Sequence, residues 1–225
     1  MRIFSNTAIS LDGRINTREG VFTTLGSDFD LRRMSELRYQ ADAVLVGGAT
    51  FRNWPHPALP EPAHLTPQQA ESLSRNQSPR YCVVVTRSLQ VPLPQTFLRE
   101  PRIRPLFLTL ASAIPAGFPA EVVGYDGPGS DLPIAWILEQ LKARGVQSLL
   151  VEAGGDLLFQ FLAAQALTEL YVTLCPKVIG GQNTPSLADG EGFLLQQIPS
   201  LSLISAQQQG DELFLHYKVK PAAAR

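Results

Sequence analysis

Two short stretches of this chain run from an apolar strand through a pair of glycines directly into a helix-like segment. They are residues 44–50, VLVGGAT, and residues 148–156, SLLVEAGGD. A strand that passes into a helix within so few residues is typical of a βα unit, whose strands lie parallel in a sheet covered by helices. Together the two stretches predict an α/β fold.

Strand-like and helix-like runs alternate through most of the chain. Helices are predicted after Ser27, which forms a capping-box pattern with Asp30; from Asp131, with Pro133 in the first turn and Gly145 as the stop; and from Asp156. The predicted strands are residues 2–9, 43–46, 81–86, 104–110, 121–124 and 148–151. This order predicts three layers, with helices on both sides of a central sheet that is mostly parallel.

The last third of the chain has a different pattern. Residues 168–175, 201–206 and 212–219 are strand-like, with no strong helix signal between them. The last two are separated by residues 207–211, QQQGD, which is a hairpin signal. The sheet is therefore predicted to be mixed, with an antiparallel hairpin at the C-terminal end.

A proline-rich insertion is predicted at residues 53–80, because five of the 18 prolines fall within residues 55–67. A segment of this length in a compact domain is usually a lid, a binding loop or a mobile excursion. A short helix is predicted at residues 66–74, where Thr66 supplies a cap and Pro67 the first helical position. We expect a single domain over residues 1–225, with a frayed tail at residues 221–225.

The bulk composition excludes several classes of protein. The chain has 225 residues, a formal net charge of −1 and no stripe of basic residues, which argues against a nucleic-acid or membrane partner. Three scattered histidines have no metal-ligand spacing, so no metal site is expected. Cys82 and Cys175 lie in apolar strand-like runs, which favours reduced core thiols and a cytoplasmic location over a disulfide.

Each glycine pair admits two interpretations. Gly47-Gly48 and Gly154-Gly155 are either tight turns that require a positive φ, or places where backbone N–H groups approach a phosphate at a helix N-terminus. Two such turns in one sheet favour a dinucleotide, whose diphosphate can lie across the carboxyl ends of neighbouring parallel strands. Glu152, at the end of its strand, is interpreted either as a partner for a ligand N–H or as a loop cap.

Two further strand ends carry polar side chains. Thr86-Arg87-Ser88 follows an apolar strand, and an arginine between two hydroxyls suits the 2′-phosphate of NADPH, although a surface arginine after a strand is common. The first strand ends in residues 10–14, SLDGR, which is either a simple turn or a functional loop held by the sheet.

These stretches together resemble a known family. SLDGRI after the first strand, DAVLVGGAT, VEAGGDLLFQFL and PKVIGG are similar to the pyrimidine reductase domain of riboflavin biosynthesis, the C-terminal domain of the bifunctional deaminase/reductase. The resemblance covers residues 3–219. It implies a dihydrofolate-reductase-like fold and an activity like that of 5-amino-6-(5-phosphoribosylamino)uracil reductase, which uses NADPH. The deaminase zinc domain has no counterpart in this sequence, so a stand-alone reductase is expected.

The resemblance also implies roles for individual residues. When hydride is transferred to the opened ribosyl group, a proton must reach the developing oxygen or nitrogen. Its predicted source is Asp12, Glu152 or a bound water, so Asp12 and Glu152 are the candidate catalytic residues. The predicted cofactor contacts are Gly47, Gly48, Thr50, Thr86, Arg87, Ser88, Gly154, Gly155, Asp156 and Leu157. The predicted substrate contacts are Asn6, Ser10, Asp12, Gly13, Trp54 and Glu152. The resemblance implies a homodimer as well, and the apolar C-terminal strands are the candidate surface for packing against a second copy.

One departure concerns the substrate. The riboflavin enzymes usually carry two acids after the Gly-Gly-x-Thr turn, whereas this chain has FRNWPHPAL at residues 51–59. Arg14, Arg32 and Arg52 are then candidate phosphate partners or plain surface charges. Two alternatives to a phosphorylated ribosylpyrimidine therefore stay open: an NADPH reductase of another carbonyl, imine or pterin-like compound, and a non-catalytic nucleotide-binding relative.

Overall fold

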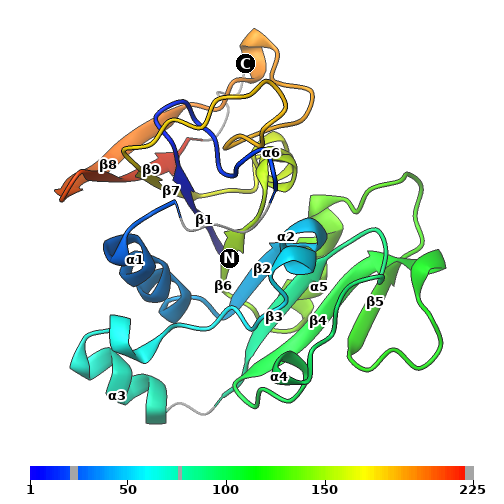
Figure 1. Ribbon diagram of the computed structural model, residues 1–225. Helices are drawn as coiled ribbons and strands as arrows, with labels where there is room; N and C mark the ends of the chain where they lie inside the picture. Colours follow the sequence, from blue (N-terminus) through cyan, green and yellow to red (C-terminus); the bar gives the residue numbers. More distant parts are fainter. Residues whose placement is uncertain (21–24, 76–77, 221–225) are drawn as a thin grey trace. The chain divides into compact units, whose positions relative to one another are not determined.

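Strands alternate with helices through most of the computed structural model, which describes residues 1–20, 25–75 and 78–220 (Figure 1). The chain divides into two units. Unit 1 comprises Met1 and Met34–Leu150, and unit 2 comprises Arg2–Arg33 and Val151–Arg225. Helix α1 (Asp28–Tyr39) and strand β6 (Ser148–Glu152) each contribute residues to both units. The predicted tail at residues 221–225 lies outside the described residues.

Unit 1 is built on parallel strands. β2 (Ala43–Gly47), β3 (Arg80–Val85), β4 (Ile103–Leu110) and β5 (Glu121–Tyr125) pair in chain order, each parallel to the next. β2 and the end of β3 are buried, as expected for strands covered on both faces. The helices are α2 (Gly48–Asn53), α3 (Pro67–Arg75), α4 (Gln95–Leu98) and α5 (Ile134–Ala143). Phe51, Phe97 and Phe107 pack edge to face in the core.

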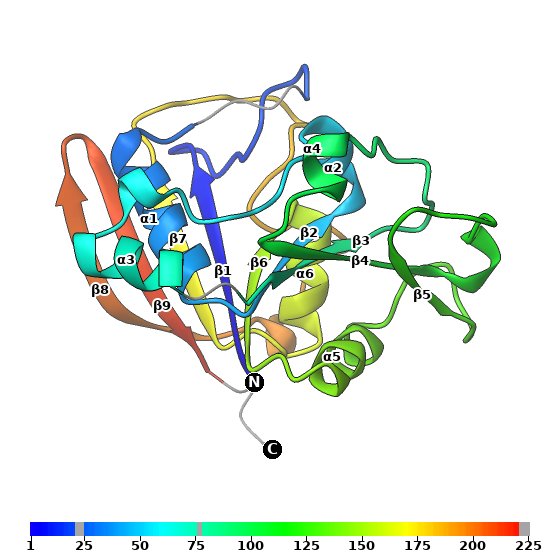
Figure 2. The same ribbon diagram turned by 90° about the horizontal axis from the view of Figure 1, so that it is seen from below.

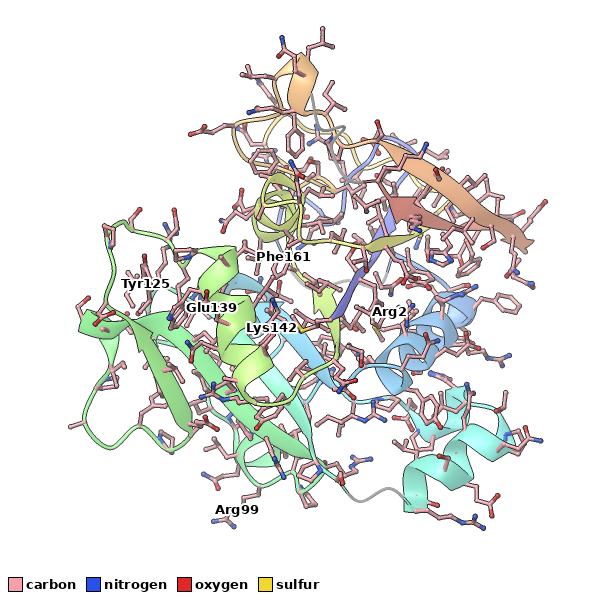
Figure 3. All side chains as sticks on the ribbon, turned by 180° about the vertical axis from the view of Figure 1, so that it is seen from behind. Arg2, Arg99, Tyr125, Glu139, Lys142 and Phe161 are labelled. Atoms are coloured by element: carbon pink, nitrogen blue, oxygen red, sulfur yellow. The ribbon has the colours of Figure 1, made fainter. Side chains whose placement is uncertain are left out.

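Helix α5 begins differently from the prediction. Pro133 occupies the N-cap position and no side chain caps the helix, while the carboxylate of Asp131 lies 3.8 Å from Arg87. The predicted cap at Asp131 is wrong, because Pro133 already fixes an extended entry into the first turn. The predicted stop is confirmed, since Gly145 has φ 80°. Glu139 and Lys142 lie on the exposed face of α5 (Figure 3), opposite the buried Ile137 and Leu141.

Unit 2 holds the mixed part of the sheet. β1 (Arg2–Ile9) pairs parallel with β7 (Glu169–Leu174), and β9 (Glu212–Val219) pairs antiparallel with both β7 and β8 (Leu201–Gln209). Figure 2 shows the β8–β9 hairpin at the edge of this unit. The predicted α/β class, with parallel strands and an antiparallel C-terminal hairpin, is confirmed. Helix α6 (Gly155–Ala163) buries Leu158, Phe161 and Leu162, and Figure 3 labels Phe161.

The C-terminal hairpin is tighter than predicted. The strands continue to Gln209 and resume at Glu212, so the connection is Gly210-Asp211 and not the five residues 207–211. Gly210 has φ 59°, which a two-residue hairpin turn requires. The polar glutamines misled the prediction because edge strands tolerate polar side chains on an exposed face.

The N-terminus of α1 uses an acid that is distant in sequence. Ser27 Oγ accepts a hydrogen bond from the N–H of Phe29 (3.2 Å), as a cap should. The backbone N–H of Ser27, however, donates to Glu212 Oε1 (2.7 Å), and its hydroxyl donates to Glu212 Oε2 (2.6 Å). The predicted capping box with Asp30 is therefore wrong: Glu212 of β9 does what Asp30 was expected to do.

Arg80, the first residue of β3, hydrogen-bonds to the carbonyl groups at the C-terminus of α1. Arg80 Nη1 donates to the carbonyl oxygens of Arg38 (2.9 Å), Tyr39 (2.8 Å) and Ala41. Carbonyl groups in the last turn of a helix have no partner within the helix, so this guanidinium satisfies them. Burial lowers the pKa of Arg80, which indicates that part of the gain is offset by desolvation of its charge.

The insertion contains the predicted short helix. Thr66 and Gln69 form a reciprocal capping box: Thr66 Oγ1 accepts from the N–H of Gln69 (3.3 Å), and Gln69 Oε1 accepts from the N–H of Thr66 (3.0 Å). Helix α3 follows at Pro67–Arg75, which confirms the prediction to within one residue at each end. A short 3-10 helix, Pro62–His64, was not predicted.

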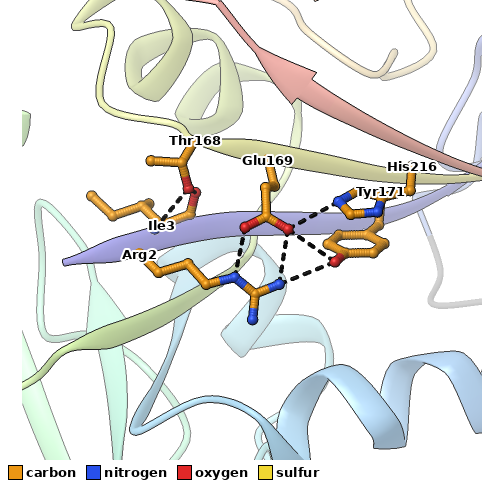
Figure 4. Close-up of polar contacts among 6 residues, drawn as sticks. All are labelled: Arg2, Ile3, Thr168, Glu169, Tyr171 and His216. Atoms are coloured by element: carbon orange, nitrogen blue, oxygen red, sulfur yellow. Dashed lines mark hydrogen bonds and ion pairs between the residues drawn. The ribbon is translucent and has the colours of Figure 1, made fainter. Parts of the chain in front are cut away.

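A charged network joins β1, β7 and β9 (Figure 4). Arg2 donates to both carboxylate oxygens of Glu169 (2.6 and 2.9 Å) and to the hydroxyl of Tyr171 (3.0 Å). Glu169 also accepts from Tyr171 (3.0 Å) and lies 2.9 Å from Nε2 of His216, whose ring stacks on Tyr171. Hydrogen bonding to Arg2, above all, lowers the pKa of Glu169 to about 2.

Two further findings bear on the predicted class of protein. Cys82 and Cys175 are both buried thiols, as predicted, and burial raises the pKa of Cys175 to about 12. Over the residues with described positions, none of the helices combines the length and apolar character needed to cross a bilayer.

Candidate active site

The predicted site residues lie in both units, and each group is described within its own unit. In unit 1, β2 passes into α2 at Gly47-Gly48. Gly47 has φ −75° and ψ 152°, and Gly48 is not among the glycines with positive φ. A Cβ on Gly48 would lie 2.5 Å from Oγ1 and 2.7 Å from Cβ of Thr86. The turn therefore does not need a positive φ; Gly48 is required because the end of β3 approaches its backbone closely.

The predicted phosphate-binding residues follow β3. Thr86 is buried, and its hydroxyl donates to the carbonyl oxygen of Ser88 (2.7 Å), which closes the turn. Arg87 is exposed over 72% of its side chain, and its only described ion pair is the 3.8 Å contact with Asp131. An exposed pair at this distance contributes little to stability, so the Arg87 guanidinium can take another anionic partner.

Trp54 lies at the C-terminal end of α2, within unit 1. Its backbone N–H donates to the carbonyl of Thr50 (3.0 Å), and its ring packs edge to face on His56 at 3.5 Å. The guanidinium of Arg38, a buried residue of α1, lies 5.9 Å from the Trp54 ring. Nothing in these contacts tests the predicted role of Trp54 in substrate binding, which stays a prediction.

In unit 2 the second glycine pair joins β6 to α6. Gly154 is the N-cap of α6 with φ −67° and ψ 169°, and Gly155 is the first helical residue; neither has a positive φ. A Cβ on Gly155 would collide with the carbonyl oxygen of Ser186 and with the carboxylate of Asp189. A Cβ on Gly154 would meet no atom within 4 Å. Packing thus explains Gly155, whereas neither backbone conformation nor packing explains Gly154.

The loop after β1 is held by a second loop of unit 2. Ser10, fully buried, donates its hydroxyl to Asp12 Oδ1 (2.6 Å), and Gly13 has φ 79°. Asp12 accepts from the backbone N–H of Ile179 (3.1 Å) and of Gly180 (2.7 Å). These hydrogen bonds, led by that from Ser10, lower the pKa of Asp12 to about 2. Asp12 is therefore ionised at neutral pH and ties two loops together.

The same second loop also contacts the glycine turn. Arg14 pairs with Ser186 in an isolated bridge and donates to the carbonyl of Thr184 (2.7 Å), while Ser186 is in turn held by Asp189 (2.6 Å). Segment 177–189 thus links the SLDGR loop to the Gly154-Gly155 turn. Sequence reasoning included PKVIGG in the resemblance but did not predict this role or that of Asp189. The two glycines of PKVIGG, Gly180 and Gly181, have φ 70° and 89°. This glycine pair was the sequence feature from which a structured loop at segment 177–189 could have been predicted.

The remaining predicted residues of unit 2 lie on β1, at the end of β6 and in the first turn of α6. Glu152 is half-buried at the end of β6, Asp156 is exposed in the first turn of α6, and Leu157 is half-buried beside it. Asn6 lies on β1, and its Oδ1 is buried without a hydrogen-bond partner. Within residues 1–20, 25–75 and 78–220, no group of three or more His, Cys, Asp or Glu side chains is arranged to hold a metal ion.

Comparison with known proteins decides the family. The profile of the RibD C-terminal domain family matches residues 2–215. The chain belongs to this family. Membership confirms the recognition made from sequence and the predicted class, an oxidoreductase of the riboflavin-biosynthesis reductase kind.

Related sequences of this family match over nearly their whole length. The chain is 28% identical over 225 residues to the 2,5-diamino-6-ribosylamino-4(3H)-pyrimidinone 5′-phosphate reductase of Methanothermobacter thermautotrophicus, covering 97% of this chain and 98% of the relative. It is 29% identical over 199 residues to the reductase of the same name from Archaeoglobus fulgidus, covering 85% and 88%.

Solved structures of the family share the fold. A pyrimidine reductase-like protein of Corynebacterium diphtheriae superimposes with a TM-score of 0.76 at 20% identity, covering 98% of this chain and 92% of that one. Acinetobacter baumannii RibD superimposes with a TM-score of 0.75 at 17% identity; this chain spans 58% of its length. These likenesses support the dihydrofolate-reductase-like fold predicted from the sequence.

Proposed function

We propose that this chain is an NADPH-dependent reductase of 2,5-diamino-6-ribosylamino-4(3H)-pyrimidinone 5′-phosphate. Two relatives with that name align with it over almost their entire length. The observation within the chain that carries the proposal is Gly154. It sits at the N-terminus of a nine-residue helix, adopts a conformation open to any residue, and has open space where a side chain would be.

A bound cofactor would occupy the open space beside Gly154. Backbone N–H groups at the start of α6 are donors without partners in the helix, and they favour a diphosphate. A side chain at position 154 would keep a diphosphate away from them. We further propose cofactor contacts from Asp156 and Leu157 beside this turn, and from Gly47, Gly48 and Thr50 in unit 1.

When bound, NADPH would supply the hydride, so the protein needs no nucleophile of its own. The residues of the chain must then hold the substrate and deliver a proton. Of the two predicted catalytic acids, Asp12 is already ionised and engaged with backbone N–H groups, so we assign it to shaping the substrate loop with Ser10 and Gly13. We assign proton delivery to the Glu152 carboxyl, two residues before Gly154.

The proposal is tested by assaying the purified protein with NADPH and with each of two substrates. One is the diaminopyrimidinone named above, and the other is its deaminated counterpart, 5-amino-6-(5-phosphoribosylamino)uracil. Oxidation of NADPH with formation of the ribityl product supports the proposal. NADPH binding without turnover of either compound would favour the alternative of another carbonyl, imine or pterin-like substrate, which the missing acids after the first glycine turn motivate.

Preference for NADPH over NADH is expected to depend on Arg87. Replacing Arg87 with alanine should raise the Kd for NADPH about tenfold or more and leave the Kd for NADH within twofold, because only NADPH carries a 2′-phosphate for the guanidinium. Fluorescence titration measures both constants. Arg75, whose side chain is 77% exposed and paired within α3, provides a matched control as Arg75→Ala. An equal change for both cofactors would remove Arg87 from the cofactor site.

We also propose a homodimer formed through the outer face of the C-terminal hairpin. By the strand register, Leu201 and Leu203 of β8 share a face with Leu213 and Tyr217 of β9, and the three leucines are 39%, 56% and 40% exposed. Apolar residues gathered on one strand face are typical of a protein interface. A cytoplasmic location, favoured by the two thiols, stays a proposal as well.

Replacing Leu203 with glutamate should convert the dimer to a monomer, because a carboxylate would be desolvated in the interface. Light scattering coupled to size exclusion measures the mass. Leu195 is even more exposed, at 82%, but lies outside the hairpin, so Leu195→Glu should leave the mass unchanged. A wild-type protein that is monomeric at micromolar concentration would contradict the proposal.

A further inference from the structure

The connection between β7 and β8, residues 175–200, is irregular apart from the 3-10 helix at Leu195–Gln197, and all of it is described by the structure. Long connections of this kind in a compact domain are usually either mobile or functional. This one is held at several points. The carbonyl of Lys177 accepts from the N–H of Leu11 (2.8 Å), and Gly190 approaches Phe159 of α6 so closely that a Cβ would lie 2.6 Å from the ring. The β7–β8 connection is therefore a fixed part of unit 2.

Asp189 fastens this connection to Ser186. Oδ1 of Asp189 accepts from the Ser186 hydroxyl (2.6 Å) and from the Ser186 N–H (3.1 Å), and Oδ2 lies 3.3 Å from the same N–H. Hydrogen bonds to a carboxylate are shorter and stronger than those between neutral groups. The Asp189 side chain thus fixes the backbone and the side chain of Ser186 together.

The Asp189–Ser186 pair rests against the first residue of α6. A Cβ on Gly155 would collide with the carboxylate of Asp189 and with the carbonyl oxygen of Ser186, although the φ of Gly155 is not positive. Gly155 therefore provides the space into which the pair fits. It directly follows Gly154, the residue that we assign to the cofactor.

Ser186 also holds the SLDGR loop. It pairs with Arg14 in an isolated antiparallel bridge, and the N–H of the next residue, Leu187, donates to the carbonyl of Gly13 (3.1 Å). A short series of contacts thus leads from the first residue of α6, through Asp189 and Ser186, to the SLDGR loop. Every member of the series lies in unit 2.

The two ends of this series are the parts of unit 2 that the proposed function gives to the two reactants. The Gly154 turn is assigned to the cofactor, and the SLDGR loop to the substrate. Hydride transfer requires the donor and acceptor carbons to be in contact, and a displacement of about 1 Å can cost about 100-fold in rate. A contact that fixes one loop relative to the other therefore acts on the rate of the reaction.

We propose that Asp189 is a positioning residue of the reductase: through Ser186 it fixes the SLDGR loop relative to α6 and so sets the approach of the substrate to the cofactor. The inference rests on the proposed function. Asp189 takes no part in the chemical step. Its loss acts on hydride transfer and not on the affinity for NADPH, because β6, the Gly154 turn and α6 are continuous in the chain and keep their own hydrogen bonds.

The test removes the Asp189 acceptor and then restores it. Asp189→Ala should lower kcat about 10- to 100-fold and leave the Kd for NADPH within about threefold, because the reactants bind but are displaced from each other. The isotope effect on kcat with 4-deuterated NADPH should rise, because hydride transfer becomes the slowest step. Asp189→Asn keeps an acceptor oxygen for Ser186 and should return kcat to within about threefold of wild type.

Thr184→Val is the control for a merely structural role. Thr184 lies in the same connection, and its hydroxyl donates to the carbonyls of Gly180 (2.6 Å) and Gly181 (3.0 Å). Valine removes these bonds at nearly constant shape and leaves the Asp189–Ser186 pair intact. The urea midpoint should fall while kcat stays within about twofold of wild type. Should Asp189→Ala fail to fold, Ser186→Ala removes only the hydroxyl donor and should lower kcat about 3- to 10-fold.

Three outcomes would overturn the positioning role and leave the reductase standing, because wild type is active in each. They are a wild-type kcat in Asp189→Ala, a loss of kcat that asparagine does not restore, and a loss of kcat in Thr184→Val that matches its loss of stability. A wild type that reduces neither the diaminopyrimidinone nor its uracil counterpart would overturn the proposed function itself, and the positioning role with it.

Discussion

Replacement of Gly154 by valine is expected to raise the Kd for NADPH at least 100-fold while changing the free energy of unfolding by less than about 0.5 kcal/mol. The backbone at Gly154, with φ −67° and ψ 169°, suits any residue, and no atom lies within 4 Å of the added Cβ. Neither backbone strain nor steric overlap is therefore expected to destabilise the folded state of this variant. A diphosphate approaching the first N–H groups of α6 would meet the branched side chain instead.

Gly155→Val is the control for this prediction, because it makes the same chemical change one residue further on. Here the new Cβ would strike the carbonyl of Ser186 and the carboxylate of Asp189, so a loss of stability of about 1–3 kcal/mol is expected. Urea unfolding and fluorescence titration measure the two quantities. If Gly154→Val binds NADPH as wild type does, the cofactor does not use this turn, and the observation on which the proposed function rests is lost.

Replacement of Glu169 by alanine is expected to give a large loss of stability, about 2 kcal/mol at neutral pH, without changing the affinity for NADPH. The change leaves the Arg2 guanidinium and the Tyr171 hydroxyl without their shared acceptor (Figure 4). Glu100→Ala removes a similar bidentate pair with Arg102, but that pair is local and its arginine is more exposed than Arg2, so the change should cost less than about 1 kcal/mol.

The cost of losing Glu169 should depend on pH in a definite direction. The folded state lowers the pKa of Glu169 from 4.5 to about 2, so the carboxylate stabilises the fold fully above pH 4.5. The contribution is lost as the pH falls from 4.5 towards 2. Urea midpoints of wild type and Glu169→Ala should therefore converge over that interval. A gap that stays constant down to pH 2.5 would show that packing, and not the ion pair, is what Glu169 contributes.

The strands were predictable from sequence because burial leaves a continuous apolar pattern. Val83, Val84 and Val85, and likewise Leu149, Leu150 and Val151, are buried and lie in the predicted strands. The helix stop at Gly145 and the cap at Thr66 were predictable because each depends on residues a few positions apart. Local chemistry of this kind is visible in a single sequence.

What sequence could not supply are contacts between residues that only the fold brings together. Glu212 caps Ser27 across 185 residues, and nothing local distinguishes it from Asp30 as the acid for that cap. Likewise, the sequence could not show that the Asp12 carboxylate accepts hydrogen bonds from N–H groups 167 and 168 residues away; the catalytic role predicted for Asp12 stays a prediction. The buried Oδ1 of Asp30 has no hydrogen-bond partner within the described structure, which no sequence pattern encodes.

The pairing of β1 with β7 has a consequence for biosynthesis. Strand β1 can pair with β7 only after residues 169–174 have been synthesised, and Arg2 and Glu169 are separated by 167 residues. Until then Ile3 and Phe4, both buried in the finished protein, remain exposed to water and to other nascent chains. Unit 2 should accordingly form late and slowly, and rapid synthesis should require chaperones that shield β1 until its partner strand is made.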